Sequence, residues 1–332
     1  MAKVKVGING FGRIGRLVMR SVLKYKSDTI EVVGINDLTD SKTLAHLFKY
    51  DSVHGKFDGD VHADGEDIVI NGRKIGVTSE RDPAKLNWCK RGAEVIIEST
   101  GFFRDDKSAG KHIEAGAKKV IISAPGSGDV QTIVLGVNDD DLDKNNKVFS
   151  NASCTTNCLA PMVKVLDDAF GVKQGFMTTI HAYTGDQALV DGPHKDLRRA
   201  RAAAVNIVPT TTGAAAAVGL VLPHLDGKLD GGAVRVPVAN GSLTDFTAVL
   251  NQDVSEQDVL DAFRKAAEGD LKGILEYSEE ELVSTDIIGN PHSCIFDSKM
   301  TKVDGNVVKV IGWYDNEAGY SARTAELVTK IV

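Results

Sequence analysis

Residues 4–15 of this 332-residue chain read VKVGINGFGRIG, a run of β-branched residues that leads into a glycine-rich turn. The turn Gly10-Phe11-Gly12-Arg13-Ile14-Gly15 fits the pattern G-x-G-x-x-G, and residues 14–25 then show the apolar spacing of a helix. A second strand-like run at 31–36 ends at Asp37, 22 residues after the last glycine of the turn. Glycines in these positions let a pyrophosphate approach the backbone at a helix N-terminus, so the stretch predicts a dinucleotide-binding βαβ unit.

The residue at the end of the second strand indicates which dinucleotide would bind. A carboxylate in the position of Asp37 accepts hydrogen bonds from ribose hydroxyls, and its charge repels a 2′-phosphate. NAD is therefore the predicted cofactor, in preference to NADP.

The first 150 residues alternate between strand-like and helical patterns. Further buried-strand runs occur at residues 94–98, 119–123, 132–135 and 148–149. Strands separated by helices predict right-handed crossovers and a parallel sheet. The Asn71-Gly72 pair lies between two short strand patterns and predicts an inserted β-hairpin. The fold class predicted for this half is α/β, a Rossmann domain with a doubly wound parallel sheet.

The pattern changes after Cys154. Residues 155–170 are predicted to be helical, and residues 176–182 and 245–250 are predicted strands. The polar stretch between 185 and 209 shows no strand periodicity, and a connection of that length in a compact domain is usually functional. Long alternating strands beside helices predict an α+β domain with a mixed or antiparallel sheet.

Two domains are expected from this change of pattern. The first is a dinucleotide-binding domain at residues 1–151, joined by the C-terminal helix at 317–332. The second is a catalytic or substrate domain at 152–316, which includes the long loop at about 185–209.

Charge and composition exclude several function classes. The chain has 46 acidic and 39 basic side chains, a net charge of −7, so a nucleic acid is not expected as its primary partner. The N-terminal residues lack the apolar run of a secretory signal, and no apolar run reaches the length of a membrane span. Four cysteines without C-x-x-C spacing do not make a disulfide framework. We expect a cytoplasmic protein.

The stretch Ser153-Cys154-Thr155-Thr156-Asn157-Cys158 lies where a strand pattern ends and a helix begins. A cysteine at a helix N-terminus faces the positive end of the helix dipole, which lowers the pKa of the thiol. The neighbouring hydroxyls and backbone N–H groups make the same place a candidate anion site. Cys154 is thus a candidate nucleophile, although a buried structural cysteine fits the same pattern. Cys158, one turn further along, is expected to be structural.

A thiol nucleophile needs a base, and His181 is the best placed of the eight histidines. It lies at the end of a predicted strand, just before the long loop, although surface and core histidines produce the same pattern. Arg235 stands out as a charge inside an apolar strand pattern, and a ligand phosphate would supply the partner that a buried charge requires. No cysteine–histidine pair has the spacing of a structural zinc site, so no metal is expected.

The chain resembles a known family, the phosphorylating glyceraldehyde-3-phosphate dehydrogenases. The resemblance runs through the whole chain and is carried by GINGFGRIGR at 7–16, SNASCTTN at 150–157, HAYTGDQ at 181–187 and WYDNE at 313–317. It implies the NAD-dependent oxidation of glyceraldehyde 3-phosphate to 1,3-bisphosphoglycerate with inorganic phosphate, in glycolysis or gluconeogenesis.

The resemblance also implies roles for individual residues. Cys154 would attack the aldehyde to form a thiohemiacetal and then a thioester, with His181 as its ion-pair partner and general base. The residues implied to bind the cofactor are Gly10, Gly12, Arg13, Ile14, Asp37, Arg81, Ser123 and Asn316. The residues implied to hold the substrate phosphate are Thr184 and Arg235. The residues implied to hold inorganic phosphate are Ser153, Thr155, Thr212 and Gly213, with Arg199 nearby.

The loop at 185–209 matches the segment that reaches a neighbouring subunit in this family, so the resemblance implies a homotetramer. Two alternatives stay open. Erythrose-4-phosphate dehydrogenase is a sister family with the same glycine turn and SNASCTTN, although HAYTGDQ and the TTTG at 210–213 favour the glyceraldehyde family. A secondary role in binding RNA or another ligand is an alternative of a different class.

Overall fold

The computed structural model describes residues 2–332, which divide into two compact units. Unit 1 contains the described residues up to 133 together with 140–152 and 321–332, and unit 2 contains residues 134–139 and 153–320. None of the helices within residues 2–332 is both long enough and apolar enough to cross a membrane.

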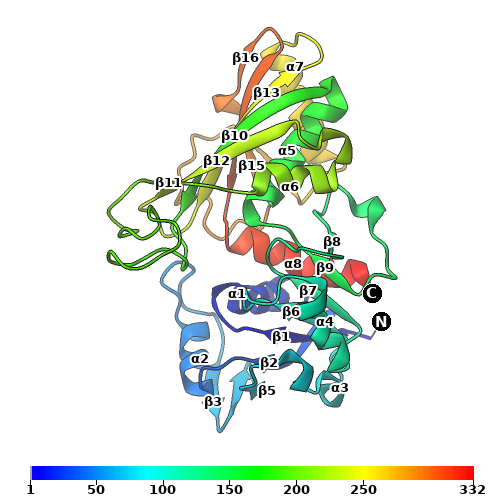
Figure 1. Ribbon diagram of the computed structural model, residues 1–332, viewed down its shortest axis with the longest axis vertical. Coiled ribbons are helices and arrows are strands. Elements are labelled where there is room, and N and C mark those ends of the chain that lie inside the picture. Colours follow the sequence, from blue (N-terminus) through cyan, green and yellow to red (C-terminus); the bar gives the residue numbers. More distant parts are fainter. Residues whose placement is uncertain (1) are drawn as a thin grey trace. The chain divides into compact units, whose positions relative to one another are not determined.

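Unit 1 is built on one sheet with helices beside it (Figure 1). Its helices are α1 (Arg13–Ser21), α2 (Ser41–Lys49), α3 (Trp88–Arg91), α4 (Asp106–Glu114) and the part of α8 (Ala318–Ile331) from residue 321 onward. Its strands are β1 (Val4–Asn9), β2 (Ile30–Asn36), β3 (Val61–Asp64), β4 (Asp67–Ile70), β5 (Arg73–Thr78), β6 (Val95–Glu98), β7 (Lys119–Ile122), β8 (Gln131–Thr132) and β9 (Val148–Ser150). Among the described residues they form a nine-stranded sheet in the order β3-β4-β5-β2-β1-β6-β7-β9-β8.

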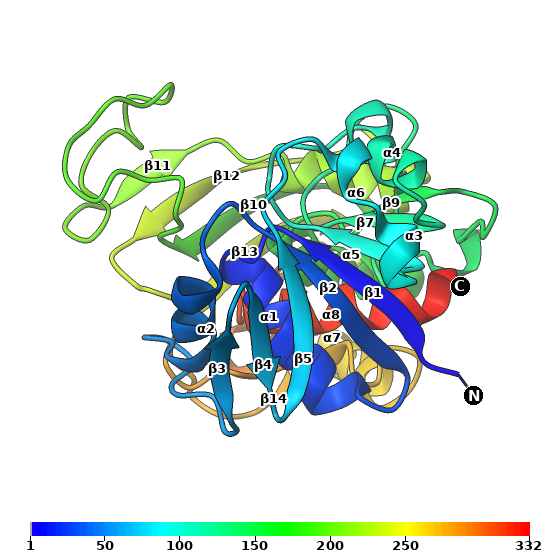
Figure 2. The ribbon, with the colours of Figure 1, turned by 90° about the horizontal axis from the view of Figure 1, so that it is seen from below.

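The chain of unit 1 starts in the middle of its sheet. Strand β1 pairs in parallel with β2 on one side and with β6 on the other, so the strand order reverses beside β1. Figure 2 shows β1, β2 and β5 running side by side. Parallel sheets bind ligands at the carboxyl ends of the strands where such a reversal occurs, and for β1 that end is the glycine turn. The predicted doubly wound parallel sheet is confirmed.

Local departures from the predicted elements have local causes. The hairpin predicted at Asn71-Gly72 is present between β4 and β5, and Asn71 has a positive φ of 51°. The helix predicted at 14–25 is α1 followed by one π-helical turn at Val22–Lys26. The strand predicted at 132–135 is wrong, since β8 ends at Thr132. Beyond it, the backbone N–H of Val134 donates to the side chain of Asn138 (2.9 Å) and the chain turns.

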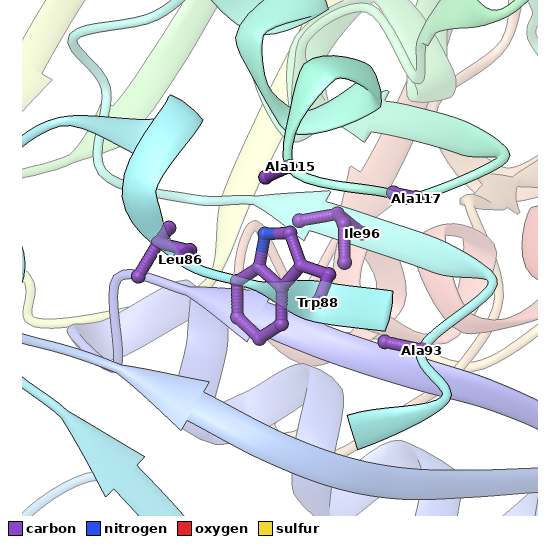
Figure 3. Packing of buried hydrophobic residues seen from close by; sticks show 6 residues of the cluster. All are labelled: Leu86, Trp88, Ala93, Ile96, Ala115 and Ala117. Atoms are coloured by element: carbon purple, nitrogen blue, oxygen red, sulfur yellow. The ribbon is translucent and has the colours of Figure 1, made fainter. Parts of the chain in front are cut away.

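A tryptophan cluster forms part of the core of unit 1. Trp88 is fully buried, and the side chains around it are those of Leu86, Ala93, Ile96, Ala115 and Ala117 (Figure 3). The indole N–H is not left unpaired, because it donates to Nδ1 of His112 on α4 (3.0 Å). The cluster therefore ties α3, β6 and the end of α4 together.

Unit 2 contains a mixed sheet. Its helices are α5 (Cys154–Phe170), α6 (Ala214–Val221) and α7 (Glu256–Glu268). Its strands are β10 (Val172–Ala182), β11 (Val208–Thr210), β12 (Leu229–Val236), β13 (Ser242–Leu250), β14 (Leu275–Ser278), β15 (Cys294–Asp297), β16 (Lys302–Asp304) and β17 (Val307–Tyr314). The order is β11-β12-β10-β13-β17-β15-β14, with β16 paired to β17. Parallel and antiparallel pairs both occur, which confirms the predicted mixed sheet.

The two faces of this sheet differ. Along β13 buried and partly exposed residues alternate, with Phe246, Ala248 and Leu250 fully buried. Helices α5 and α6 lie along the sheet (Figure 1). Residues 183–207 form a long excursion without helix or strand, which confirms most of the stretch predicted at 185–209, although the last two of those residues belong to β11. The excursion connects the end of β10, where His181 lies, to β11.

Candidate active site

Cys154 and His181 come together in unit 2. Cys154 is the first residue of α5, whose N-terminus is capped by the Ser153 hydroxyl accepting from the N–H of Thr156 (3.0 Å). His181 is the penultimate residue of β10 and is 4% exposed. The Cys154 Sγ lies 3.4 Å from Nε2 of His181. Two residues that are 27 positions apart in the chain thus form a thiol–imidazole pair.

The other ring nitrogen of His181 has two neighbours. Nδ1 lies 2.7 Å from the carbonyl oxygen of Ala182 and 3.0 Å from Nη1 of Arg235. A proton on Nδ1 would be donated to the carbonyl, which leaves Nε2 free to accept a proton from the thiol. Without that proton, Nδ1 accepts from Arg235 and Nε2 carries the hydrogen that faces sulfur. Either arrangement places a proton between sulfur and nitrogen.

Arg235 brings a positive charge to this pair. It lies on β12, beside His181 in the parallel register with β10. Its Nη1 donates to the hydroxyl of Thr184 (3.0 Å) and to the carbonyl of Ala182 (3.1 Å). Within residues 2–332 no carboxylate forms an ion pair with the guanidinium, and the buried Nε has no hydrogen-bond partner. A half-buried cation without a counterion suits an anionic ligand such as a phosphate.

Arg199 differs from Arg235 because its charge is already compensated. Its Nη1 donates to Asp186 (2.7 Å), and its Nε lies 3.6 Å from a carboxylate oxygen of Asp196. Asp186 also accepts from the hydroxyl of Thr184, which in turn accepts from Arg235. Hydrogen bonds therefore connect the side chains in the order Arg235, Thr184, Asp186 and Arg199.

Two predicted phosphate-site hydroxyls already have partners in the protein. The hydroxyl of Thr155 is within hydrogen-bond distance of the Tyr314 hydroxyl (2.9 Å), and Thr212 accepts from the N–H of Ala214 (3.2 Å). Gly213 precedes the first residue of α6. At Thr155 and Gly213 the backbone N–H groups are the better candidates for contact with an anion, whereas the Thr212 hydroxyl only accepts from Ala214 and keeps its hydrogen for an anion.

Burial governs the titration of the thiol and the imidazole taken one at a time. It raises the pKa of the Cys154 thiol, although the charge of Arg235 and the amide of Thr155 act in the opposite direction. Burial, with the charge of Arg235 as the second cause, lowers the pKa of His181 to about 3. The low pKa expected for a lone Cys154 thiol is therefore wrong, because desolvation of the sulfur outweighs the helix N-terminus.

The pair behaves differently from its members. Thiolate and imidazolium 3.4 Å apart attract each other by about 5 kcal/mol at an effective dielectric constant of about 20. This corresponds to about 3.5 pKa units, as much as the lowering of the His181 pKa. Since the proton moves within the pair, no net charge is created, and the two groups titrate together. The attraction therefore offsets the lowering of the His181 pKa, while the raised pKa of the Cys154 thiol still favours the neutral pair at rest.

Tyr314 supports the pair and was not among the predicted site residues. Its hydroxyl lies 2.9 Å from that of Thr155 and 2.8 Å from that of Thr179, and its ring meets the His181 imidazole edge-on. Burial raises the pKa of Tyr314 well above its usual value, so it stays a neutral phenol. The WYDNE motif contains this tyrosine, but its three contacts come from distant parts of the chain.

Cys158 is fully buried one turn after Cys154. Its thiol donates to the carbonyl of Gly312 at 3.5 Å, so it points into the core and fits the structural role expected from the sequence. All four cysteines are free thiols. The described residues contain no group of three or more His, Cys, Asp or Glu side chains arranged to hold a metal ion.

The glycine turn of unit 1 has the features of a dinucleotide site. Gly10 has a φ of 88°, and a Cβ there would collide with the backbone of Ser99 and Thr100. At Gly12, by contrast, a Cβ would enter open space directly before α1. Asp37 pins the turn, since its carboxylate accepts from the N–H of Phe11 (2.7 Å). Gly10 thus permits the tight turn against residues 99–100, and Gly12 leaves the backbone before α1 accessible to a pyrophosphate, as the predicted cofactor requires.

The remaining predicted cofactor residues have varied surroundings. The Arg13 side chain pairs with Asp51 (3.1 Å), which leaves its backbone as the part expected to face a ligand. Ile14 is partly buried in α1, Arg81 is exposed, and Ser123 follows β7 and is partly buried. In unit 2, Asn316 is 6% exposed, and its Oδ1 accepts from the hydroxyl of Ser242 (2.8 Å) and the N–H of Gly241 (3.2 Å).

Comparison with known proteins agrees with these observations. Residues 4–106 match the family model described as the NAD binding domain of glyceraldehyde 3-phosphate dehydrogenase, and residues 153–316 match the model of its C-terminal domain. The chain is 62% identical over 330 residues to glyceraldehyde-3-phosphate dehydrogenase of Priestia megaterium, which covers 99% of this chain and 98% of the relative. It is 61% identical to glyceraldehyde-3-phosphate dehydrogenase 1 of Bacillus subtilis, with the same coverage. Identity to the Mycobacterium avium enzyme of the same name is 58% over 333 residues, again 99% of this chain and 98% of the relative.

Proposed function

Because the chain belongs to the glyceraldehyde-3-phosphate dehydrogenase family, we propose that it oxidises D-glyceraldehyde 3-phosphate to 1,3-bisphosphoglycerate with NAD⁺ and inorganic phosphate, in glycolysis and gluconeogenesis. NAD is its cofactor, since residues 4–106 match the NAD binding domain of the family. The observation that carries the proposal is the 3.4 Å contact between Cys154 Sγ and His181 Nε2, beside the guanidinium of Arg235, for which residues 2–332 supply no ion-pair partner.

The first step is the attack of Cys154 on the aldehyde carbon. The substrate phosphate is held by Arg235 and the hydroxyl of Thr184, which share a 3.0 Å hydrogen bond. The thiol proton moves to Nε2 of His181 as the sulfur–carbon bond forms, and the carbonyl oxygen then takes that proton from the imidazolium. The product is a neutral thiohemiacetal on Cys154, with His181 neutral again.

The second step is the oxidation of the thiohemiacetal. His181 Nε2 accepts the hydroxyl proton, and its Nδ1 proton is stabilised by the Ala182 carbonyl at 2.7 Å. Bound NAD⁺ supplies the acceptor for the hydride that leaves the same carbon, so that a thioester remains on Cys154. The positive charge of the imidazolium favours the later entry of an anion.

The third step is phosphorolysis of the thioester. We assign inorganic phosphate to the N-termini of α5 and α6, where Ser153, Thr155, Thr212 and Gly213 lie, with Arg199 nearby. The hydroxyl of Thr155 is bonded to Tyr314, so its backbone N–H is the group assigned to phosphate. A phosphate oxygen attacks the thioester carbon, the carbon–sulfur bond breaks, and Cys154 leaves as a thiolate beside His181.

We assign cofactor binding mainly to unit 1 and catalysis to unit 2. Gly10, Gly12 and the backbones of Arg13 and Ile14 would receive the pyrophosphate, and Asp37 would accept from the adenosine ribose. Arg81 and Ser123 would contact the cofactor further along, and Asn316 would bind the nicotinamide carboxamide. The open space at Gly12 and the pinned turn at Asp37 support this assignment.

We further propose that the protein acts as a homotetramer in the cytoplasm. Apolar side chains in the excursion of unit 2 are strongly exposed, with Leu189 at 82%, Leu197 at 81% and Val205 at 76%. Apolar groups this exposed in one segment are typical of an interface, and a second copy of the chain is the partner expected from the family. Free cysteines and a catalytic thiol fit a reducing compartment.

The test is NADH formation by the purified protein with and without inorganic phosphate. We expect turnover with glyceraldehyde 3-phosphate that depends on phosphate and is lost in Cys154→Ser. Erythrose 4-phosphate serves as the competing substrate, and a higher kcat/KM with it would reassign the protein to the sister activity. Turnover that ignores phosphate would indicate hydrolysis of the thioester and contradict the phosphorylating reaction.

A further inference from the structure

Ser242 links the base-bearing strand to the residue assigned to the nicotinamide. It is the first residue of β13 and is 1% exposed. A serine hydroxyl can donate one hydrogen bond and accept others. Here it accepts from the N–H of Ala182 (3.0 Å) and donates to Oδ1 of Asn316 (2.8 Å).

The first of these contacts holds the end of β10. The carbonyl of Ala182 is the group that orients His181, since it lies 2.7 Å from Nδ1 and also accepts from Arg235 at 3.1 Å. The N–H of the same residue is anchored on Ser242. The hydroxyl therefore restrains the residue against which the imidazole is aligned.

The second contact fixes which way the Asn316 amide points. Its Oδ1 accepts from both the Ser242 hydroxyl and the N–H of Gly241. Rotating the amide by half a turn would place its NH₂ group against two donors, which a buried site does not tolerate. The NH₂ group is thus directed away from Ser242 and is free to donate to a ligand carbonyl.

We propose that Ser242 is a positioning residue that orients the Asn316 amide toward the carboxamide of the nicotinamide and ties this orientation to the strand end that carries His181. The proposal rests on the function proposed above for Asn316. The Ser242 hydroxyl accepts from the strand end that carries His181 and donates to Asn316, so it connects two parts of the site.

The experiment compares two ligands and two matched variants. NAD⁺ and ADP-ribose differ in the nicotinamide, so only NAD⁺ can use the Asn316 amide. Ser242→Ala removes the hydroxyl that orients Asn316. Thr244→Val is the control, because Thr244 lies two residues along β13, is fully buried and has a hydroxyl without a hydrogen-bond partner in the described part of the chain. Dissociation constants are measured by calorimetry on the full-length protein.

We expect Ser242→Ala to weaken NAD⁺ binding by about 10-fold and to leave ADP-ribose binding unchanged, as the loss of one buried hydrogen bond predicts. Thr244→Val should change neither constant. In an Asn316→Ala background, Ser242→Ala should have no further effect on NAD⁺. If Ser242→Ala fails to fold, Ser242→Cys keeps a weak donor of similar shape and should show a smaller loss that is also confined to NAD⁺.

Three outcomes overturn the proposal. Equal losses for NAD⁺ and ADP-ribose, or no loss for either, would mean that Ser242 only supports the sheet. A selective loss in Asn316→Ala without one in Ser242→Ala would remove the inference and leave the role of Asn316 intact. No selective loss in Asn316→Ala would instead remove the proposed role of Asn316, and the inference with it.

Discussion

Two buried histidines, one in each unit, show how differently the same side chain can be used. His112 on α4 is fully buried, and its Nδ1 accepts from the indole N–H of Trp88 (3.0 Å) while its Nε2 faces Glu98 (2.9 Å). An indole N–H can only donate, so Nδ1 must accept and Nε2 must carry the proton. The tautomer of His112 is therefore locked.

The carboxylate opposite His112 is equally well satisfied. Glu98 also accepts from the side chain of Asn9 and from the N–H and hydroxyl of Thr100. His181, in contrast, has two alternative partners for Nδ1 and a titratable thiol at Nε2. The comparison indicates that a buried histidine becomes reactive when its surroundings accept two protonation states, and that burial by itself does not make it so.

The largest effect is expected from removing the reactive histidine. His181→Asn should lower kcat by about 10²- to 10⁴-fold, because the base for each proton transfer is lost. The melting temperature should change little in comparison. The matched control is His224→Asn, since His224 is largely exposed and should leave kcat unaltered. A loss in His181→Asn smaller than about tenfold would contradict the role of this residue.

The satisfied histidine should matter for stability instead. Glu98→Ala leaves the N–H of the neutral His112 imidazole and the donors of Asn9 and Thr100 without their acceptor, and should lower the free energy of unfolding of unit 1 by about 3–5 kcal/mol. Trp88→Phe removes only the donor to Nδ1 and should cost about 1–3 kcal/mol. Urea denaturation measures both. Full stability in Glu98→Ala would show that the buried network contributes nothing to the fold.

The two arginines extend the comparison to charges. Arg235 has no ion-pair partner within residues 2–332, whereas Arg199 pairs with Asp186. Arg235→Lys keeps the charge but loses the planar fork, and should raise KM for the phosphorylated aldehyde by about 10- to 100-fold. Arg199→Lys should raise that KM by much less. KM is measured from initial rates over a range of substrate concentrations. An equal rise in KM in the two variants would contradict the assignment of the substrate phosphate to Arg235.

An effect smaller than that of Glu98→Ala is expected on the pH dependence of stability. The unfolded chain protonates His181 below a pKa of about 6.5, whereas in the folded protein this pKa is lowered to about 3. Between these values the unfolded state binds more protons, so stability falls as the pH is lowered, by about 1.4 kcal/mol per pH unit. His181→Asn should remove this contribution. The measurement is the free energy of unfolding of wild type and variant between about pH 6 and pH 4. The same dependence on pH in both proteins would contradict this prediction.

Local features of the fold were predictable from the sequence. The glycine turn and Asp37 were predictable because each depends on residues close to it in the sequence. In the structure the carboxylate of Asp37 accepts a hydrogen bond from the N–H of Phe11 in the turn. The strand predicted at 132–135 failed because an apolar run signals burial without saying whether the backbone pairs. The spacing of apolar residues was sufficient to predict a parallel sheet in unit 1 and a mixed sheet in unit 2, since this spacing reflects which faces of a strand or helix are buried.

The site was less accessible to such reasoning. From the residues alone, Cys154 and His181 stayed open between reactive and structural roles, and the family resemblance singled them out. Tyr314 and Ser242 were missed because their contacts join distant segments: Thr155 and Tyr314 are 159 positions apart. Glu98 and His112 were missed for the same reason, since each lies within an ordinary strand or helix pattern. The pKa of Cys154 was misjudged because desolvation depends on the three-dimensional surroundings.

The most direct test of the account is to look for the thioester itself. The protein is mixed with NAD⁺ and glyceraldehyde 3-phosphate in the absence of inorganic phosphate, and the acylated peptide is identified by mass spectrometry while NADH is followed by absorbance. We predict one NADH per active site in a burst, an acyl group on the peptide that contains Cys154, and release of that group when phosphate is added. No acyl group on Cys154, or a group whose release does not depend on phosphate, would contradict the mechanism.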